Sequence, residues 1–338
     1  MSMKKKLLTL FSATALTLTL AACGDSDSSS GDKDHPTSNL TIVAPSGAGG
    51  GWDLTARSIS KVMNETKLIE KPITVENKPG GGGAAFMATY ATKEAKNDHM
   101  LMVKSPPILI NNLKAEGNSP YGYKDTTPLA QLTKDFGAIV VRADSPYKSL
   151  TDLLDAIKAD PTALTMAGGS SPGSMDHLIT ILPAFEYGID PKAVKYVSYD
   201  GGGEAMAALL GNNADAIGTD ISTVTAYVKS GDVRVLAITS PEKLKIEGLE
   251  DIPTLYDLNI DAEFTIWRGL FGPKDMSDTA KEYWIEKLKE LNEKDEWKAE
   301  LERNGWEQDF RVGDDFTKFL EEQEGTITEI LTALGMQK

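Results

Sequence analysis

The chain has 338 residues, 41% of them hydrophobic, and a formal net charge of −15. This length and composition can bury a full core and allow two domains. The acidic balance argues against nucleic acid as a partner and against electrostatic binding to anionic lipid. It also gives an anionic ligand no long-range attraction, so an anion site would have to use local backbone dipoles.

Residues 1–22 are predicted to be an export signal. Three lysines at positions 4–6 precede an apolar run over residues 7–20, which is too short to span a bilayer as a permanent helix. The run ends in LAAC at residues 20–23, which resembles the bacterial lipoprotein cleavage box, in which the cysteine is lipidated and becomes the first residue. Removal of residues 1–22 leaves 32 of the 35 basic residues against 50 acidic ones, a formal charge of about −18.

Cys23 is the only cysteine, which excludes disulfides, a thiolate metal site and a thiol nucleophile in the folded part. We expect residues 23–39 to be a lipid-anchored flexible linker, because residues 24–39 carry no large apolar side chain. Such a coil spans roughly 20 Å. These features predict an extracytoplasmic protein anchored to the cell membrane. Gly24 and the Lys- and Glu-rich body favour a Gram-positive surface over a Gram-negative periplasm.

The stretch over residues 40–57, LTIVAPSGAGGGWDLTAR, predicts a strand, a glycine-rich turn and a helix start. Glycine lets the backbone approach a ligand, and the free N–H groups of a first helical turn favour an anion. The dinucleotide fingerprint fails because Trp52 stands where Gly or Ala is needed, and the phosphate-loop motif fails at the same position. The turn therefore holds a carboxylate, or it is a tight βα turn with a helix-capping Asp53 and no ligand.

Strand-like runs alternate with loops and helical patterns along most of the chain. This alternation predicts a parallel α/β sheet with ligands at the carboxyl ends of its strands. Further glycine-rich loops at 80–83, 168–174 and 200–203 suggest two lobes whose helix ends face a cleft. We expect strands at 40–43, 72–76, 100–103, 139–141, 164–167, 194–199, 214–219 and 233–239, and helices at 84–96, 145–157, 279–304 and 314–334.

Several motifs resemble one family in their order along residues 40–330. They are VAPSGAGGGWD (43–53), VENKPGGGG (75–83), GGSSPGSMDH (168–177), YDGG (199–202), LAITS (236–240), DIPT (251–254), and Trp267 with GLFGP (269–273), followed by Gly305. The chain resembles the substrate-binding receptors of tripartite tricarboxylate transporters, also called Bug receptors. It is most similar to their tricarboxylate (citrate) branch. Asp200 departs from the lysine of many relatives and removes a positive charge near the expected site.

The resemblance implies a two-lobed periplasmic-binding-protein fold of the second type, with residues 40–140 and 241–338 as lobe 1 and residues 141–240 as lobe 2. It implies a monomer without catalytic activity or cofactor, which closes on a small carboxylate, with citrate or another tricarboxylate as first candidate. The loaded receptor would deliver this ligand to a permease with a large and a small integral subunit. The alternatives are a receptor read by a sensor kinase, or one for a dicarboxylate, an amino acid or another small carboxylate.

The resemblance and the helix-terminus argument together predict the ligand contacts. Asp53 and Asp176 either cap helices, accept a hydrogen bond from a ligand hydroxyl, or help to bind a metal–citrate complex; no metal site of the protein's own is expected. Trp52 is a lid or ordinary packing, and His177 is a packed histidine. A hydrolase built from Ser174, His177 and an aspartate lacks the G-x-S-x-G elbow. The predicted ligand-binding residues are Ser46, Gly47, Ala48, Gly49, Gly50, Gly51, Trp52, Asp53, Gly80, Gly81, Gly169, Ser170, Ser171, Gly173, Ser174, Asp176, His177, Tyr199, Gly201 and Gly202.

Overall fold

The computed structural model describes residues 35–117, 119–246 and 248–338. The predicted export signal, the lipidation site Cys23 and most of the predicted linker lie outside these residues. Of the linker, residues 35–39 are described, and two of them contact the folded part. The ring of His35 lies 5.2 Å from that of His99, and the Thr37 N–H donates to His99 Nε2 at 3.2 Å. Within the described residues, no helix combines the length and apolar character needed to cross a membrane.

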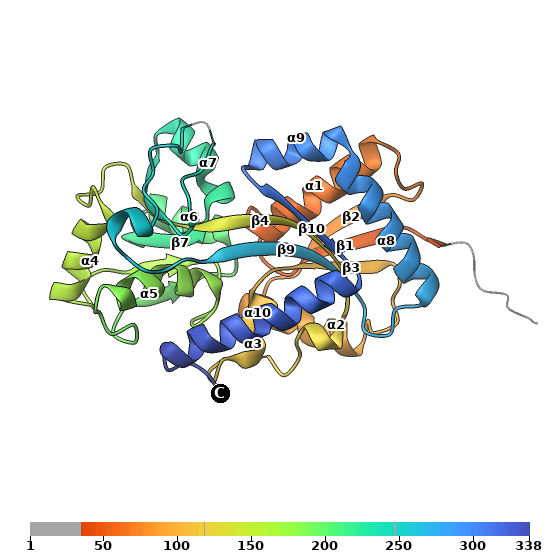
Figure 1. Cartoon of the computed structure of the whole chain (residues 1–338), viewed down its shortest axis with the longest axis horizontal. Coiled ribbons are helices and arrows are strands. Elements are labelled where there is room, and N and C mark those ends of the chain that lie inside the picture. Colours follow the sequence, from red (N-terminus) through yellow and green to blue (C-terminus); the bar gives the residue numbers. More distant parts are fainter. Residues whose placement is uncertain (1–34, 118, 247) are drawn as a thin grey trace, which may run out of the picture. The chain divides into compact units, whose positions relative to one another are not determined.

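Strands and helices alternate through most of the described chain (Figure 1). The strands are β1 (Leu40–Ala44), β2 (Ile73–Asn77), β3 (Met100–Lys104), β4 (Thr127–Arg142), β5 (Met166–Gly168), β6 (Tyr196–Ser198), β7 (Ala216–Asp220), β8 (Val233–Ile238), β9 (Thr265–Gly272) and β10 (Glu307–Val312). The helices are α1 (Gly51–Glu65), α2 (Ala84–Thr92), α3 (Pro107–Leu113), α4 (Leu150–Ala159), α5 (Met175–Glu186), α6 (Gly202–Leu210), α7 (Ile221–Ser230), α8 (Asp278–Glu293), α9 (Asp295–Asn304) and α10 (Asp314–Ala333).

β4 links two groups of strands. Its first part pairs with β9 and β10, and its second part, from Gly137 onward, pairs with β7 and β8. The strand order is β2-β1-β3-β9-β4-β7-β5-β6, with β8 and β10 also on β4. Figure 1 shows β4 and β9 running side by side between the two groups.

The sheet is mixed, which corrects the prediction of a parallel sheet. β1 pairs in parallel with β2 and β3, and β5 pairs in parallel with β6 and β7. All pairings of β4 and β9 are antiparallel. The βα alternation indicated the two parallel groups correctly, but it carried no information about the long strands between them.

The C-terminal helical stretch is interrupted, although a continuous helix was predicted over residues 279–304. Lys294 has an extended backbone (ψ 136°), so α8 ends at Glu293 and α9 begins at Asp295. The short helix α3, helix α7 and strand β10 were not predicted.

α1 buries an apolar stripe in the core. Ala56, Ile59, Val62 and Met63 are fully buried and belong to a core cluster with Trp284 and Trp297 of α8 and α9. This packing fixes the axis of α1 and therefore places its N-terminus, at Gly51, at the carboxyl end of β1.

Candidate functional site

The glycine-rich loops predicted to bind ligand meet one another. The Gly47 N–H donates to the carbonyl of Asp200 at 2.8 Å, which joins the loop after β1 to the loop after β6. A Cβ added to Gly169 would lie 2.3 Å from Gly202 N, and one added to Gly82 would lie 3.1 Å from Ser171 Oγ. Contacts this close need glycine, because a side chain at these positions would force the backbones apart.

These loops enclose a cavity of about 40 Å³. α1, α5 and α6 all begin at its wall, so three helix N-termini with their positive dipole ends lie around it. The lining residues are Ser46, Gly50, Gly51, Trp52, Gly82, Ser105, Pro107, Gly169, Ser170, Met175, Asp176, Gly201, Gly202, Thr219, Asp220 and Arg268. Pockets for small molecules measure about 300–1,000 Å³, so the loops have to separate before a carboxylate can enter.

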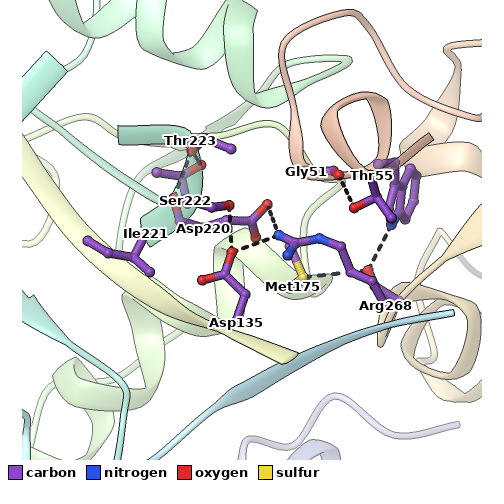
Figure 2. A network of polar contacts seen from close by, with 12 residues as sticks. Gly51, Thr55, Asp135, Met175, Asp220, Ile221, Ser222, Thr223 and Arg268 are labelled. Carbon is purple, nitrogen blue, oxygen red and sulfur yellow. Dashed lines mark hydrogen bonds and ion pairs between the residues drawn. The ribbon is translucent and has the colours of Figure 1, made fainter. Parts of the chain in front are cut away.

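Arg268 supplies a buried cation to this cavity. Its side chain is 1% exposed, and its Nη2 lies 2.8 Å from Asp220 Oδ2 and 2.9 Å from Asp135 Oδ2 (Figure 2). Ser222 Oγ donates to the same oxygen of Asp135 at 2.6 Å. Burial raises the pKa of Asp135, although the charge of Arg268 opposes the shift. Among the described residues, Arg268 Nη1 and Asp220 Oδ1 have no hydrogen-bond partner.

Asp176 lines the cavity with a carboxyl group that favours its neutral form. Burial, followed by the charge of Asp220, raises the pKa of Asp176 well above its usual value. Asp176 Oδ2 accepts the Gly169 N–H at 2.6 Å, and the Asp176 N–H donates to Ser170 Oγ at 2.8 Å. A protonated carboxyl can lie beside an anion without charge repulsion, which reconciles this residue with a carboxylate site.

Asp53 supports the first loop and does not line the cavity. Its carboxylate accepts hydrogen bonds from the Gly49 N–H at 3.0 Å, Arg57 Nε at 3.0 Å and Asn77 Nδ2 at 2.9 Å. Asn77 also donates to the Ser46 carbonyl at 3.2 Å. The N-cap of α1 is Gly50, so Asp53 acts from inside the first turn to hold the preceding loop.

Trp52 both packs and lines the cavity. Its Nε1 donates to Ser105 Oγ at 2.8 Å, and Lys104 Nζ lies 4.5 Å from the centre of its ring. Lys104 is fully buried, and burial lowers its pKa to about 7.

The other predicted site residues lie around the cavity or in neighbouring ones. Gly81, Ser171 and Tyr199 line a second cavity of about 240 Å³, and Ser171, Gly173 and His177 line a third of about 550 Å³. Gly47, Ala48, Gly49, Gly80 and Ser174 do not line the first cavity.

The hydrolase arrangement is not formed. His177 Nδ1 accepts the Gly173 N–H at 2.8 Å, and Ser174 Oγ has no hydrogen-bond partner within the described chain. No group of three or more His, Cys, Asp or Glu side chains able to hold a metal ion occurs among the residues that the structure describes. Since its oxygens already accept three donors, Asp53 is poorly placed for the metal–citrate role considered for it.

The lining residues that sequence reasoning missed are Gly82, Ser105, Pro107, Met175, Thr219, Asp220 and Arg268. The signal for the charged ones was a charge inside an apolar strand run, as in AIGTD (216–220) and TIWRGLFG (265–272). A charge buried in a strand needs a partner, so Asp135, Asp220 and Arg268 could have been proposed as a cluster.

Comparison with known proteins identifies the family. Residues 55–336 match the family described as "Tripartite tricarboxylate transporter family receptor". A Cupriavidus necator protein named "UPF0065 protein in gbd 5'region" is 28% identical over 306 residues, which cover 90% of this chain and 89% of that protein.

Solved structures show the same fold. The periplasmic binding protein BugD has a TM-score of 0.79 at 22% identity and covers 90% of this chain and 100% of its own. MatC from Rhodopseudomonas palustris, solved with bound malate, has a TM-score of 0.76 at 21% identity. The match covers 88% of this chain and 99% of the MatC chain. The predicted periplasmic-binding-protein fold is therefore confirmed, while the lobe boundaries stay a prediction. The chain belongs to the tripartite tricarboxylate transporter receptor family, whose members are solute-binding receptors and not enzymes.

Proposed function

We propose that this receptor binds a small carboxylate in the 40 Å³ cavity once its loops separate, and delivers it to a tripartite tricarboxylate transporter permease. The observation that carries the proposal is the convergence on one cavity of three helix N-termini and of Arg268, whose Nη1 has no partner among the described residues. Backbone N–H groups and a guanidinium are the donors that recognise a carboxylate.

Local donors have to supply the affinity, because the acidic chain as a whole repels an anion. A hydrogen bond to a charged group contributes roughly 1.5–3 kcal/mol net. Several of these bonds in a closed site suffice for micromolar affinity, which corresponds to about −8 kcal/mol. The raised pKa of Asp176 favours its neutral form, which would remove one source of repulsion and add a donor.

Entry of the ligand requires movement between the two groups of strands. Asp220 ends β7 in one group, and Arg268 lies on β9 in the other, so their ion pair closes the cavity from both sides. A carboxylate that accepts hydrogen bonds from donors of both groups would replace this ion pair as the link across the cavity, which couples binding to closure as a shift between open and closed states.

Citrate or another tricarboxylate is the first candidate ligand, on the resemblance of the GGWD (50–53) and SMDH (174–177) motifs. The malate bound to MatC supports the broader class of small carboxylates. We further propose that Cys23 carries a lipid that holds the receptor beside its permease. A Cys23→Ala chain that still fractionates with membranes after export would contradict the anchor.

The deciding experiment is thermal unfolding of the purified protein with citrate, citrate plus Mg²⁺, isocitrate, tricarballylate, succinate, malate, glutamate and nicotinate. A ligand at a hundred times its dissociation constant adds about 2.7 kcal/mol, which is a shift on the order of a few degrees. A shift with citrate or tricarballylate alone supports the tricarboxylate assignment, and a shift with succinate or malate alone moves it to dicarboxylates. If no carboxylate shifts the midpoint, the proposed ligand class is wrong.

A further inference from the structure

We propose that the third cavity, of about 550 Å³, is a second site that binds a small oxyanion such as inorganic phosphate. It lies between the segment just after α3, the loop before α5 and the C-terminal residues Gly335 and Met336. No residue lines both this cavity and the 40 Å³ cavity. The site is therefore separate from the proposed carboxylate site, although the loop at residues 169–173 contributes to both.

Lys114 is a buried cation with no counter-ion among the described residues. The residue is 2% exposed, and its Nζ donates to Ser171 Oγ at 2.9 Å and to the Pro172 carbonyl at 2.7 Å. Both acceptors are neutral, and within the described part of the chain Lys114 forms no ion pair. Burial lowers the pKa of Lys114 to about 8. A desolvated ammonium is costly unless a negative charge offsets it, and an anion in the adjoining cavity would do so.

His177 also lines this cavity, and its ring carries a buried donor. Its Nδ1 accepts the Gly173 N–H at 2.8 Å, so the proton of the neutral ring lies on Nε2. The residue is 6% exposed, and among the described residues Nε2 has no partner. Burial, followed by the charge of Lys114, lowers the pKa of His177 to about 4. At neutral pH the ring therefore carries a hydrogen-bond donor that no described residue accepts, close to a lysine whose charge no described acid offsets.

The remaining charges on the wall favour an anion as well. Lys192 reaches the C-terminal turn, where a Cβ on Gly335 would lie 3.4 Å from its Nζ. Against these cations the lining contains a single carboxylate, that of the exposed Glu116. A compact group with several acceptor oxygens can take hydrogen bonds from Lys114 and His177 at once, as phosphate, sulfate or a carboxylate does.

The test uses the histidine resonances in a proton NMR titration. The chain has three histidines, His35, His99 and His177, and a His177→Gln variant assigns the third signal. We expect inorganic phosphate at pH 7 to shift the His177 signal saturably and to raise its pKa, because an anion offsets Lys114 and stabilises the imidazolium. The signals of His35 and His99 should not move, and sodium chloride at equal ionic strength should have no effect.

Two lysine variants separate the site from general charge. Lys114→Met should weaken phosphate binding at least tenfold, whereas Lys338→Met should leave it unchanged, since Lys338 donates to the Asn112 carbonyl and does not line the cavity. Sulfate tests the oxyanion class, and citrate tests whether the cavity also takes the transported solute. The proposal is overturned if millimolar phosphate and sulfate do not shift the His177 signal of the wild-type protein. It is also overturned if a folded Lys114→Met variant binds phosphate as tightly as the wild type does.

Discussion

Arg268 on β9 and Asp220 at the end of β7 form a fully buried ion pair, with 2.8 Å between Nη2 and Oδ2. Asp135 on β4 accepts from the same Nη2 at 2.9 Å, so one guanidinium nitrogen joins strands of both groups (Figure 2). Buried ion pairs are weak sources of stability because desolvation offsets their attraction. We infer that this cluster serves binding and closure more than it serves the free energy of folding.

Arg268→Lys should weaken carboxylate binding at least tenfold. Lysine keeps the positive charge but lacks the planar fork, so it cannot hold Asp135 and Asp220 and still offer a second nitrogen to a ligand, as the proposed function requires. Isothermal titration with the best ligand of the panel measures the loss. The control is Arg234→Lys, because Arg234 donates to the Ala143 and Tyr147 carbonyls and does not line the cavity. Equal dissociation constants for Arg268→Lys and the wild type would show that Arg268 does not contact the ligand.

Gly51→Ala should lower the free energy of unfolding by about 1–3 kcal/mol and disturb binding. A Cβ at this position would lie 2.2 Å from Asp220 Oδ2 and 2.5 Å from Arg268 Nη2, so the ion pair has to shift. Denaturant unfolding measures the change.

The matched control is Gly325→Ala in α10, where a Cβ meets nothing within 4 Å. That change should stabilise the protein by roughly 0.5–1 kcal/mol, because alanine is the better helix former. Gly51→Ala with unchanged stability and affinity would be incompatible with the observed contact.

Asp53→Asn should remove a pH-dependent part of the stability. Burial raises the pKa of Asp53, but hydrogen bonds from Arg57, Gly49 and Asn77 outweigh it and hold the pKa below 3.8. A depressed carboxyl pKa stabilises the folded state above the unfolded pKa, and this contribution disappears as the pH falls through the folded pKa. The variant should therefore be less stable than the wild type at pH 7 by about 1–3 kcal/mol, with the gap narrowing below pH 4.

The control for this comparison is Asp144→Asn, which alters an exposed pair with Arg142 and should change little. Urea unfolding of all three proteins at pH 7, 5 and 3 gives the result. A gap between the wild type and Asp53→Asn that stays constant from pH 7 to pH 3 would mean that the carboxylate does not hold the loop.

The sequence predicted the loops of the site better than its charges. The turn after β1 and the loop before α5 were recognisable because glycine and serine clusters follow short apolar runs. Their approach to each other was expected from two lobes that present glycine-rich loops to one cleft, although β1 and β5 belong to different parallel groups. Which glycines face the cavity could not be inferred: Gly49 donates its N–H to Asp53, and Gly47 to Asp200, while Gly50 and Gly51 line the wall.

The long antiparallel strands explain most of what the sequence did not reveal. In β4, the buried polar residues Gln131, Thr133 and Asp135 interrupt the apolar pattern, so only residues 139–141 were predicted as a strand. Arg268 likewise interrupts an apolar run, and it was not predicted as a site residue. Its partners lie 133 and 48 positions away in the chain, and a local pattern cannot reveal such pairs.

Lys104→Met should stabilise the protein more at pH 6 than at pH 10. Burial lowers the pKa of Lys104 from 10.5 to about 7, so between these values the unfolded chain binds a proton that the folded chain has released. The contribution of Lys104 to the free energy of unfolding therefore rises with pH across that window. Lys104 destabilises the folded state most below pH 7, where its buried side chain has to carry a charge. At about 1.4 kcal/mol per pKa unit, we expect the gain at pH 6 to exceed that at pH 10 by roughly 1–4 kcal/mol.

The control is Lys318→Met on the exposed face of α10, which should show no such difference. Guanidinium unfolding at both pH values decides the matter. A gain that is equal at pH 6 and pH 10 would mean that Lys104 keeps its proton in the folded state, held by the ring of Trp52 and the carbonyl of Gly83.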